Sequence, residues 1–139
     1  MAIAKNIHET HFANVDLDIY SRSNLEPLVA AMGRKILVLH VGRIKRTHEA
    51  HLELSRITQT ADATVRGFCA LVRALPKAER KLWDNAKIRE FNIGVHARLK
   101  PLTFEMTLHE ETVRAAAEVN ARIGFTLYSP AMEEKHVAG

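Results

Sequence analysis

The fold is decided by residues 13–41, which read ANVDLDIYSRSNLEPLVAAMGRKILVLHV. Residues 13–20 alternate apolar and polar side chains, which is the pattern of a half-buried strand. Residues 25–32 place apolar side chains at i, i+3, i+4 and i+7 on one helical stripe, and Gly33 follows as a helix stop. Residues 35–41 are apolar on both faces, as is typical of a strand inside a sheet. This stretch therefore predicts a strand–helix–strand unit.

The rest of the chain continues the same two patterns. A polar turn at residues 42–47 leads into an alternating segment, and this predicts a hairpin with a basic loop at its tip. Further strands are expected at residues 48–55, 88–96, 102–108 and 122–128, helices between Thr60 and Pro76 and at 110–119, and a helical turn at 77–85. The order is β-α-β-β-α-β-β-α-β, which indicates an α+β fold. We expect a two-layer sandwich, with one mixed sheet of six strands and three main helices on one face.

An internal similarity agrees with this organisation. Residues 18–40 align with residues 105–127 at a shift of 87 positions, and the apolar strand positions, the helical stripe and the helix stop coincide. A repeated β-α-β unit explains the coincidence, and the alternative is that any two such units look alike. The length suits a single domain over residues 1–139, with a core at 13–129 and loose tails at both ends.

Composition excludes several classes of protein. Apolar residues make up 47% of the 139 residues and charged residues 26%, which is not the composition of an intrinsically disordered chain. No apolar run approaches the roughly 20 residues of a membrane span, and the N-terminus lacks the apolar core of a secretory signal. The single cysteine, Cys69, allows no internal disulfide and lies in an apolar helical stripe, where we expect it to be buried. These features favour a cytoplasmic protein.

Two segments resemble a known family. Residues 91–128 begin with FNI and end with HEETVRAAAEVNARIGFTLY, and residues 19–33 read IYSRSNLEPLVAAMG. In both segments the pattern of strands and helix caps resembles the bacterial family designated domain of unknown function 4279, over roughly residues 13–129. The resemblance implies a small bacterial α+β domain. It implies no functional residues.

The familiar catalytic and cofactor motifs do not occur in the sequence. It contains no glycine-rich nucleotide loop, no HExxH or CxxC metal motif and no GxSxG nucleophile turn. We therefore assign no catalytic residue, no metal ligand and no cofactor. His8 and His11, with Glu9 between them, could together bind a metal ion, but residues of a tail are usually solvated.

The sheet face that the helices leave open is expected to be rich in polar side chains. By strand alternation it should carry Asp16, Asp18, Tyr20, Glu49, His51, Glu53, Asn92, His96, Thr103, Glu105, Thr107, Thr126 and Tyr128. Carboxylates beside histidines on neighbouring strands can bind a cation or act as acid and base, and the alternative is an ordinary solvated face.

Three aliphatic side chains should share that open face. Leu37, Leu39 and Val41 alternate along one strand, and exposing all of them would be costly, so we expect a partner or a second copy to cover them. A homodimer is one such arrangement. The candidate interaction face comprises Leu37, Leu39, Val41, Asp18, Tyr20, His51, His96, Glu105 and Tyr128.

The net charge of +4 is concentrated near the predicted hairpin. The whole positive excess falls within residues 34–56, and the hairpin tip carries Arg43, Lys45 and Arg46. Such a concentration of positive charge attracts acidic partners. Replacing the three residues with glutamine should slow the association of these partners with the protein. No aromatic platform stands beside the hairpin tip, which disfavours nucleic acid as the partner. A solvated hairpin loop is the alternative.

Three hypotheses for function follow. The first is a non-enzymatic protein-interaction module, immunity-like or regulatory, with a protein partner and no membrane contact. The second is a small-ligand or metal-dependent enzyme that uses the acidic and histidine side chains of the open face. The third is weak nucleic-acid binding through the hairpin.

Overall fold

The computed structural model describes residues 8–130, and within that range the chain forms five strands and four α-helices. The strands are β1 (His11–Ser21), β2 (Ile36–Ile44), β3 (Thr47–Leu54), β4 (Ile88–His96) and β5 (Arg122–Tyr128). The helices are α1 (Glu26–Met32), α2 (Ala61–Arg73), α3 (Lys77–Asp84) and α4 (Glu110–Glu118), and a short 3-10 helix (Gly33–Lys35) follows α1. The predicted α+β class is confirmed.

All five strands belong to one mixed sheet in the order β2-β3-β1-β4-β5. The central strand, β1, is antiparallel to both of its neighbours, β3 and β4. β2 and β3 form the predicted antiparallel hairpin. β5 runs parallel to β4, which requires a long crossover, and the chain makes it through α4. β2 and β5 are therefore the two edges of the sheet.

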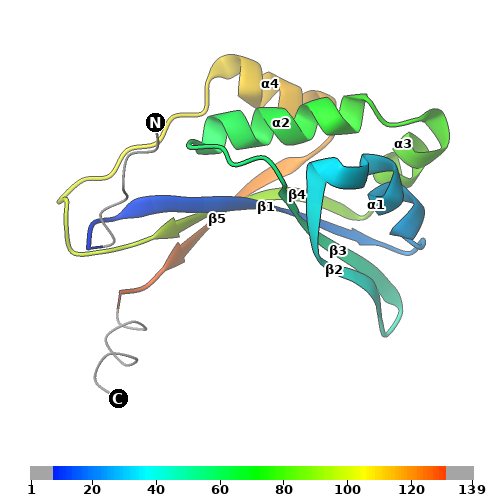
Figure 1. The fold of residues 1–139 in the computed structure, drawn as a ribbon, viewed down its shortest axis with the longest axis horizontal. Helices are drawn as coiled ribbons and strands as arrows, with labels where there is room; N and C mark the ends of the chain where they lie inside the picture. Colours follow the sequence, from blue (N-terminus) through cyan, green and yellow to red (C-terminus); the bar gives the residue numbers. More distant parts are fainter. Residues whose placement is uncertain (1–7, 131–139) are drawn as a thin grey trace.

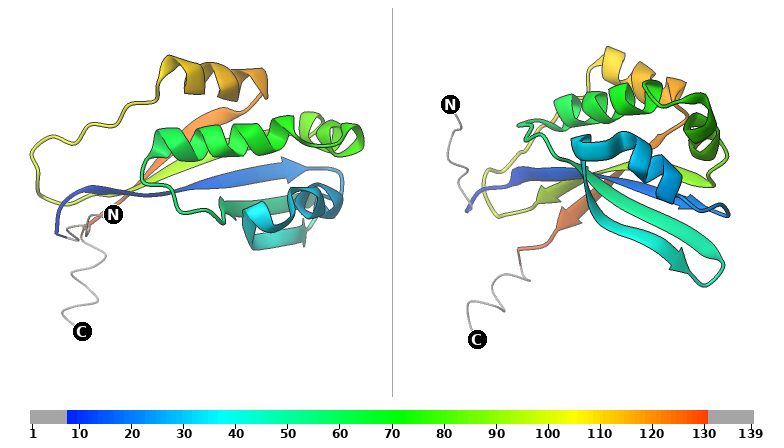
Figure 2. Two further views of the ribbon diagram at one scale, coloured as in Figure 1. Left: turned by 45° about the horizontal axis from the view of Figure 1, so that its top comes forward. Right: turned by 45° about the vertical axis from the view of Figure 1, so that its right-hand side comes forward.

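The four α-helices lie on one face of the sheet and leave the other face open (Figure 1). α2 crosses the middle of the sheet, α1 lies towards the β2 side, and α4 lies towards β5 (Figure 2). Phe68 of α2 stacks on Phe91 of β4 with ring centroids 5.6 Å apart, and Trp83 of α3 packs beside them. Phe68, Cys69 and Trp83 are completely buried, which confirms the burial predicted for Cys69. Burial also raises the pKa of the Cys69 thiol to about 11.

The helix ends follow local sequence signals. Thr60 caps α2 by accepting a hydrogen bond of 3.1 Å from a first-turn N–H group. Gly33 and Asn120 follow α1 and α4 with φ angles of 61° and 60°, so both stop signals act as predicted. At the start of α1, the Asn24 side chain accepts a hydrogen bond of 3.0 Å from the N–H group of Glu26.

The prediction of six strands is wrong, because residues 102–108 do not form a strand. They belong to an exposed connection, residues 97–109, that leads from β4 to α4 outside the sheet. Leu102 is 99% exposed there. The outer edge of β4, where a sixth strand would pair as a hairpin, is occupied by β5 in parallel register.

The prediction of three main helices also differs from the structure. The expected helical turn at residues 77–85 is a helix of eight residues, α3, so the described part of the chain has four α-helices. The repeated β-α-β unit is wrong at its first strand, because β1 aligns with the exposed connection. Its helix and second strand do correspond, since α1 and β2 align with α4 and β5.

The sheet begins earlier in the chain than the predicted core at residue 13. β1 already begins at His11, and Glu9 forms an isolated parallel bridge with Lys100. The N–H group of Thr10 donates a hydrogen bond of 2.7 Å to the Lys100 carbonyl. Residues 1–7 and 131–139, which make up most of the two predicted tails, lie outside the described residues.

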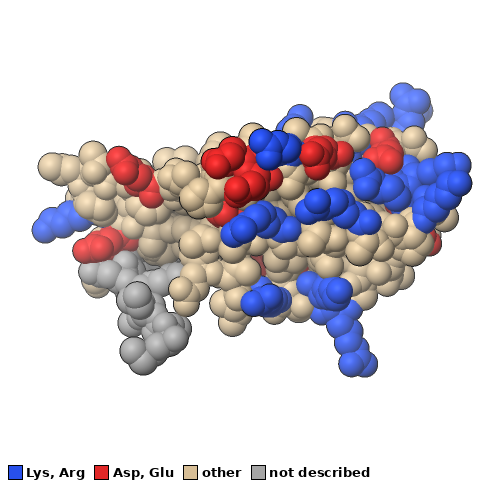
Figure 3. Space-filling view, turned by 90° about the horizontal axis from the view of Figure 1, so that it is seen from above, with Lys and Arg blue, Asp and Glu red and all other residues tan. Residues whose placement is uncertain are grey.

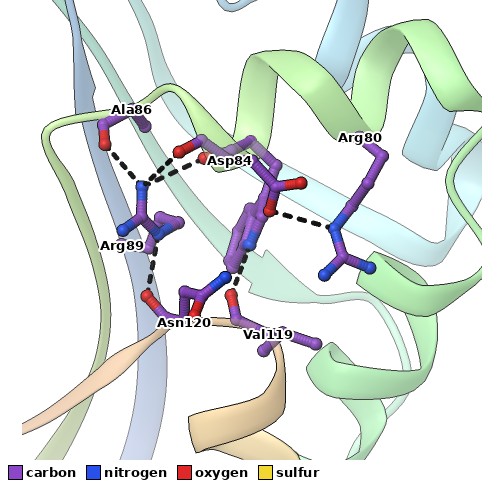
Figure 4. Close-up of polar contacts among 7 residues, drawn as sticks. Arg80, Asp84, Ala86, Arg89, Val119 and Asn120 are labelled. Carbon is purple, nitrogen blue, oxygen red and sulfur yellow. Dashed lines mark hydrogen bonds and ion pairs between the residues drawn. The ribbon is translucent and has the colours of Figure 1, made fainter.

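The C-terminal ends of α3 and α4 meet over Arg89 of β4 (Figure 4). Its guanidinium donates hydrogen bonds to the carbonyl groups of Trp83 and Asp84 in the last turn of α3 and of Ala86 just after it. It also donates to the carbonyl group of Asn120, which follows α4. The Trp83 indole N–H adds a buried hydrogen bond of 2.7 Å to the carbonyl of Val119. One strand residue thereby fixes the ends of two helices.

Candidate functional site

The open face of the sheet brings carboxylates and histidines together across β1 and β3. The antiparallel register places Asp18 opposite His51 and Tyr20 opposite Glu49. His51 Nδ1 lies 2.7 Å from Asp18 Oδ1, and His51 Nε2 lies 3.5 Å from Glu49 Oε1. The imidazole is thus held between two carboxylates from its own and the neighbouring strand.

Aromatic rings extend this arrangement to both sides. The ring of Tyr20 meets His51 edge-on at 5.6 Å, and the ring of His40 on β2 lies 5.9 Å from it. Burial, and next the carboxylate of Asp18, raises the pKa of the Tyr20 hydroxyl. Tyr20 therefore stays protonated and can act as a hydrogen-bond donor.

Asp16 lies at the next step along β1 and is the most perturbed carboxylate of this face. The Asn14 amide donates hydrogen bonds to Asp16 Oδ1 at 2.9 Å and to Glu53 Oε1 at 3.2 Å. Burial, followed by the negative charges of Glu53 and Asp18, raises the pKa of Asp16 to about 6, although His51 opposes this shift. A carboxyl group with such a pKa can exchange a proton near neutral pH.

A second polar cluster lies on β4 and β5. Glu90 of β4 pairs with Arg122 of β5 at 2.9 Å, and Asn92 accepts a hydrogen bond of 2.9 Å from Thr126. At the far end of the face, the rings of His11, His96 and Tyr128 form a row across β1, β4 and β5, with centroids 5.1 and 5.3 Å apart. The predicted open-face residues of these strands therefore share one face but lie in separate groups.

The connection takes three predicted residues away from this face. Thr103, Glu105 and Thr107 lie in the exposed segment outside the sheet, so including Glu105 in the interaction face was wrong. Sequence reasoning missed His40, Asn14, Glu90 and Arg122. The alternation of β1 and β4 contains the signal for Asn14 and Glu90, since both fall in phase with residues that were named. The signal for His40 is hidden by an irregularity of β2.

That irregularity is a β-bulge at Leu39. Val38 lies opposite Leu52 and His40 opposite His51, so Leu39 is an extra residue without a partner on β3. After the bulge the alternation reverses. Val41 consequently packs against the core instead of joining Leu37 on the open face, and its place in the interaction face was wrong.

The exposed aliphatic side chains of β2 nevertheless form a continuous run. Leu37 and Leu39 are each 53% exposed and Val38 is 48% exposed, and Ile44 near the hairpin tip is similar. β2 is an edge strand, paired only with β3 among the described residues. The other edge, β5, also exposes Phe125 and Leu127.

Basic side chains stand at both ends of β2. Arg34 and Lys35 precede the strand, and Arg43, Lys45 and Arg46 lie at the hairpin tip. All five are exposed, and Arg43 Nε donates a hydrogen bond of 2.9 Å to the Lys45 carbonyl. Lys and Arg side chains protrude along the lower and right-hand rim of the molecule in Figure 3. The predicted basic hairpin tip is thus present and accessible.

A cavity of about 240 Å³ lies where β3 leaves the sheet beside the first half of β1. Its apolar wall includes Phe12, Val15 and Leu54, and its polar wall includes Asn14 and Glu53. It therefore adjoins the Asp16 cluster. Among residues 8–130, no group of three or more histidine, cysteine, aspartate or glutamate side chains is placed to hold a metal ion.

Comparison with known proteins gives no relative of this chain: no protein-family model, no curated protein and no solved structure matches it. None of the helices in the described range is long and apolar enough to cross a membrane.

Proposed function

We propose that the protein is a non-enzymatic protein-interaction module that binds a protein partner through the β2 edge. One observation carries this proposal: three consecutive aliphatic residues, Leu37, Val38 and Leu39, are half exposed on an edge strand. Burying the exposed half of such a side chain contributes about 1 kcal/mol. A partner that covers all three gains that contribution from each of them.

The setting of this interaction belongs to the same proposal. The family resemblance and the absence of extracellular features in the sequence support a bacterial, cytoplasmic protein with an immunity-like or regulatory role. Two kinds of partner fit an exposed strand edge, a different protein or a second copy of the chain, and the homodimer expected from sequence remains a prediction.

The proposal is tested by comparing baits in extracts of the native host. The wild-type protein, the double variant Leu37→Thr/Leu39→Thr and the control variant Glu105→Gln are immobilised in parallel. We expect that one protein from the extract binds to the wild-type and control baits but not to the double variant. This protein should also form a stoichiometric complex with the wild type when both components are purified. If purified candidates bind all three baits equally, the β2 edge is not the binding surface.

A second candidate function rests on the acid–base groups of the open face. Asp18 Oδ1 and His51 Nδ1 are 2.7 Å apart, and Asp16, whose carboxyl group has a raised pKa, lies one step along the same strand. Asp16 accepts a hydrogen bond from Asn14, which lines a cavity. Such a carboxyl group could bind or turn over a small polar ligand. Thermal-shift screening of metabolites against the wild type and His51→Gln would support this function if one compound stabilises only the wild type.

A further inference from the structure

We propose that the outer edge of β2 binds an extended segment of another protein, one whose apolar centre is flanked on both sides by carboxylate side chains. The segment adds a strand to the sheet beside β2. This inference rests on the interaction function proposed above and specifies the chemistry of the partner.

The backbone of β2 is suited to strand addition. β2 has nine residues and pairs only with β3 among the described strands, so its other side offers backbone donors and acceptors, in a row that the bulge at Leu39 interrupts once. Main-chain hydrogen bonds supply affinity in this mode of recognition, and side-chain contacts supply specificity. Leu37, Val38 and Leu39 provide the apolar contacts in the first half of the edge, between the two groups of basic residues.

The charges at the two ends of β2 select the partner. Arg34 and Lys35 lie before the strand, and Arg43, Lys45 and Arg46 lie around its end, all exposed. If the added segment has carboxylates before and after its apolar centre, these carboxylates lie next to the basic residues at both ends of β2. This holds whether the segment runs parallel or antiparallel to β2. Such charges increase the rate of association and fix the register of the added strand.

The same charges disfavour a second copy of the chain. An antiparallel pair of β2 strands centred on His40 would place Lys35 opposite Lys45 and Arg34 opposite Arg46. A parallel pair would place each basic residue beside its own copy. Like charges directly opposite each other destabilise strand pairs, so the β2 edge repels itself and admits an acidic segment.

The test uses a fluorescent peptide with an alternating valine–threonine centre and glutamates at both ends, titrated with the full chain and followed by anisotropy. One control peptide replaces the glutamates with lysines, and another carries prolines at alternate central positions. We expect the glutamate peptide to bind at least about tenfold more tightly than either control at low salt. We also expect this preference over the lysine peptide to shrink as salt rises.

Protein variants locate the binding site. The charge reversal Arg43→Glu/Lys45→Glu/Arg46→Glu should lose the glutamate peptide and gain the lysine peptide. Leu39→Thr should weaken binding several-fold, whereas Leu127→Thr on the other sheet edge should leave it unchanged. Circular dichroism and urea unfolding confirm that each variant is folded before its binding is compared.

Several results would overturn the inference. Equal binding of the proline peptide, or equal binding of a single-stranded oligonucleotide, would show that the basic groups attract any anion without strand addition. A wild-type dimer that Leu39→Thr dissociates would make a second copy the occupant. If a native partner is lost from Leu127→Thr but not from Leu39→Thr, the interaction function stands and the assignment to β2 fails.

Discussion

At the ends of α3 and α4, four backbone carbonyl groups converge on the Arg89 guanidinium. Carbonyl groups at a helix C-terminus have no partner within the helix and carry partial negative charge. A planar cation with several N–H groups satisfies them together, which a lysine ammonium at the same point cannot do with the same geometry. A single residue near the start of β4 thus positions the ends of two helices.

Replacing Arg89 with alanine should lower the free energy of unfolding by about 2 kcal/mol, because hydrogen bonds from a charged donor are lost together. Arg89→Lys should recover only part of this loss. The control is Arg80→Ala, which removes the exposed ion pair with Asp84 and should cost less than about 0.5 kcal/mol. Urea unfolding measures all three, and equal effects of the two alanine variants would contradict the role given to Arg89.

Asp16 makes stability depend on pH in a defined direction. Its pKa is raised from 3.8 to about 6 in the folded protein, so between these values the folded state binds the proton more tightly than the unfolded state. The contribution of Asp16 to stability is therefore present below pH 3.8 and is lost as the pH rises to about 6.

Asp16→Asn should remove this loss, because the amide is neutral and still accepts a hydrogen bond from Asn14. We expect the variant to exceed the wild type by about 1 kcal/mol above pH 6, a value reduced for partial exposure, and the difference to vanish at low pH. Urea unfolding across this range provides the measurement. Glu105→Gln, in the exposed connection, controls for the change in net charge, and a constant difference between Asp16→Asn and the wild type would contradict the assignment.

At the scale of elements, the sequence patterns predicted all five strands that pair in the sheet. The apolar run at residues 35–41 predicted β2 as a strand inside the sheet, however, whereas β2 lies at an edge. Helical stripes with stop signals predicted α1, α2 and α4, and α3 was expected only as a helical turn. These patterns report which side chains are apolar and at what period. They do not report which sheet edge is free, and residues 102–108 alternate like a strand although β5 occupies the edge of β4. The bulge at Leu39 also gives no signal, because residues 36–39 are all aliphatic and any phase fits them. The open face was therefore predicted on β1 and β3 but misassigned on β2 and the connection.

The exposed connection predicts a contrast between two apolar substitutions. Leu102→Ala should change the free energy of unfolding by less than about 0.5 kcal/mol, because its side chain is already in water. Ile93→Ala, in the completely buried centre of β4, should cost about 3 kcal/mol through the cavity it leaves. Thermal or urea unfolding gives both values. A large effect of Leu102→Ala would show that this segment packs in the sheet as the sequence pattern suggests.

At the scale of the molecule, the open face of the sheet and the β2 edge carry charges of opposite sign. The open face carries the carboxylates of Asp16, Asp18, Glu49, Glu53 and Glu90, while the β2 edge carries basic groups at both ends. This separation gives the molecule a polarity that its modest net charge of +4 does not reveal. Partners of opposite sign are therefore steered to different places.

Removing charge from the hairpin tip should increase self-association. The triple variant Arg43→Gln/Lys45→Gln/Arg46→Gln should unfold within about 0.5 kcal/mol of the wild type, since exposed charges contribute little. Its β2 edge, however, loses like charges that would lie opposite each other if two β2 strands paired. Sedimentation velocity at increasing concentration should show oligomers that a further Leu39→Thr suppresses. A control with Lys77, Lys81 and Arg114 changed to glutamine should behave as the wild type does.

The position of β1 at the middle of the sheet has a consequence for synthesis on the ribosome. Among the described strands β1 is translated first, yet one of its two neighbours is β4, whose Phe91 lies opposite Leu17. Such distant pairing slows folding compared with local hairpins. While residues up to about Lys87 emerge, the strand that will become the centre of the sheet remains an open edge with its apolar side chains only partly covered. The nascent chain thus passes through a stage in which apolar strand residues that the folded protein buries are still exposed. Chaperones that bind extended apolar segments would bind the chain at this stage.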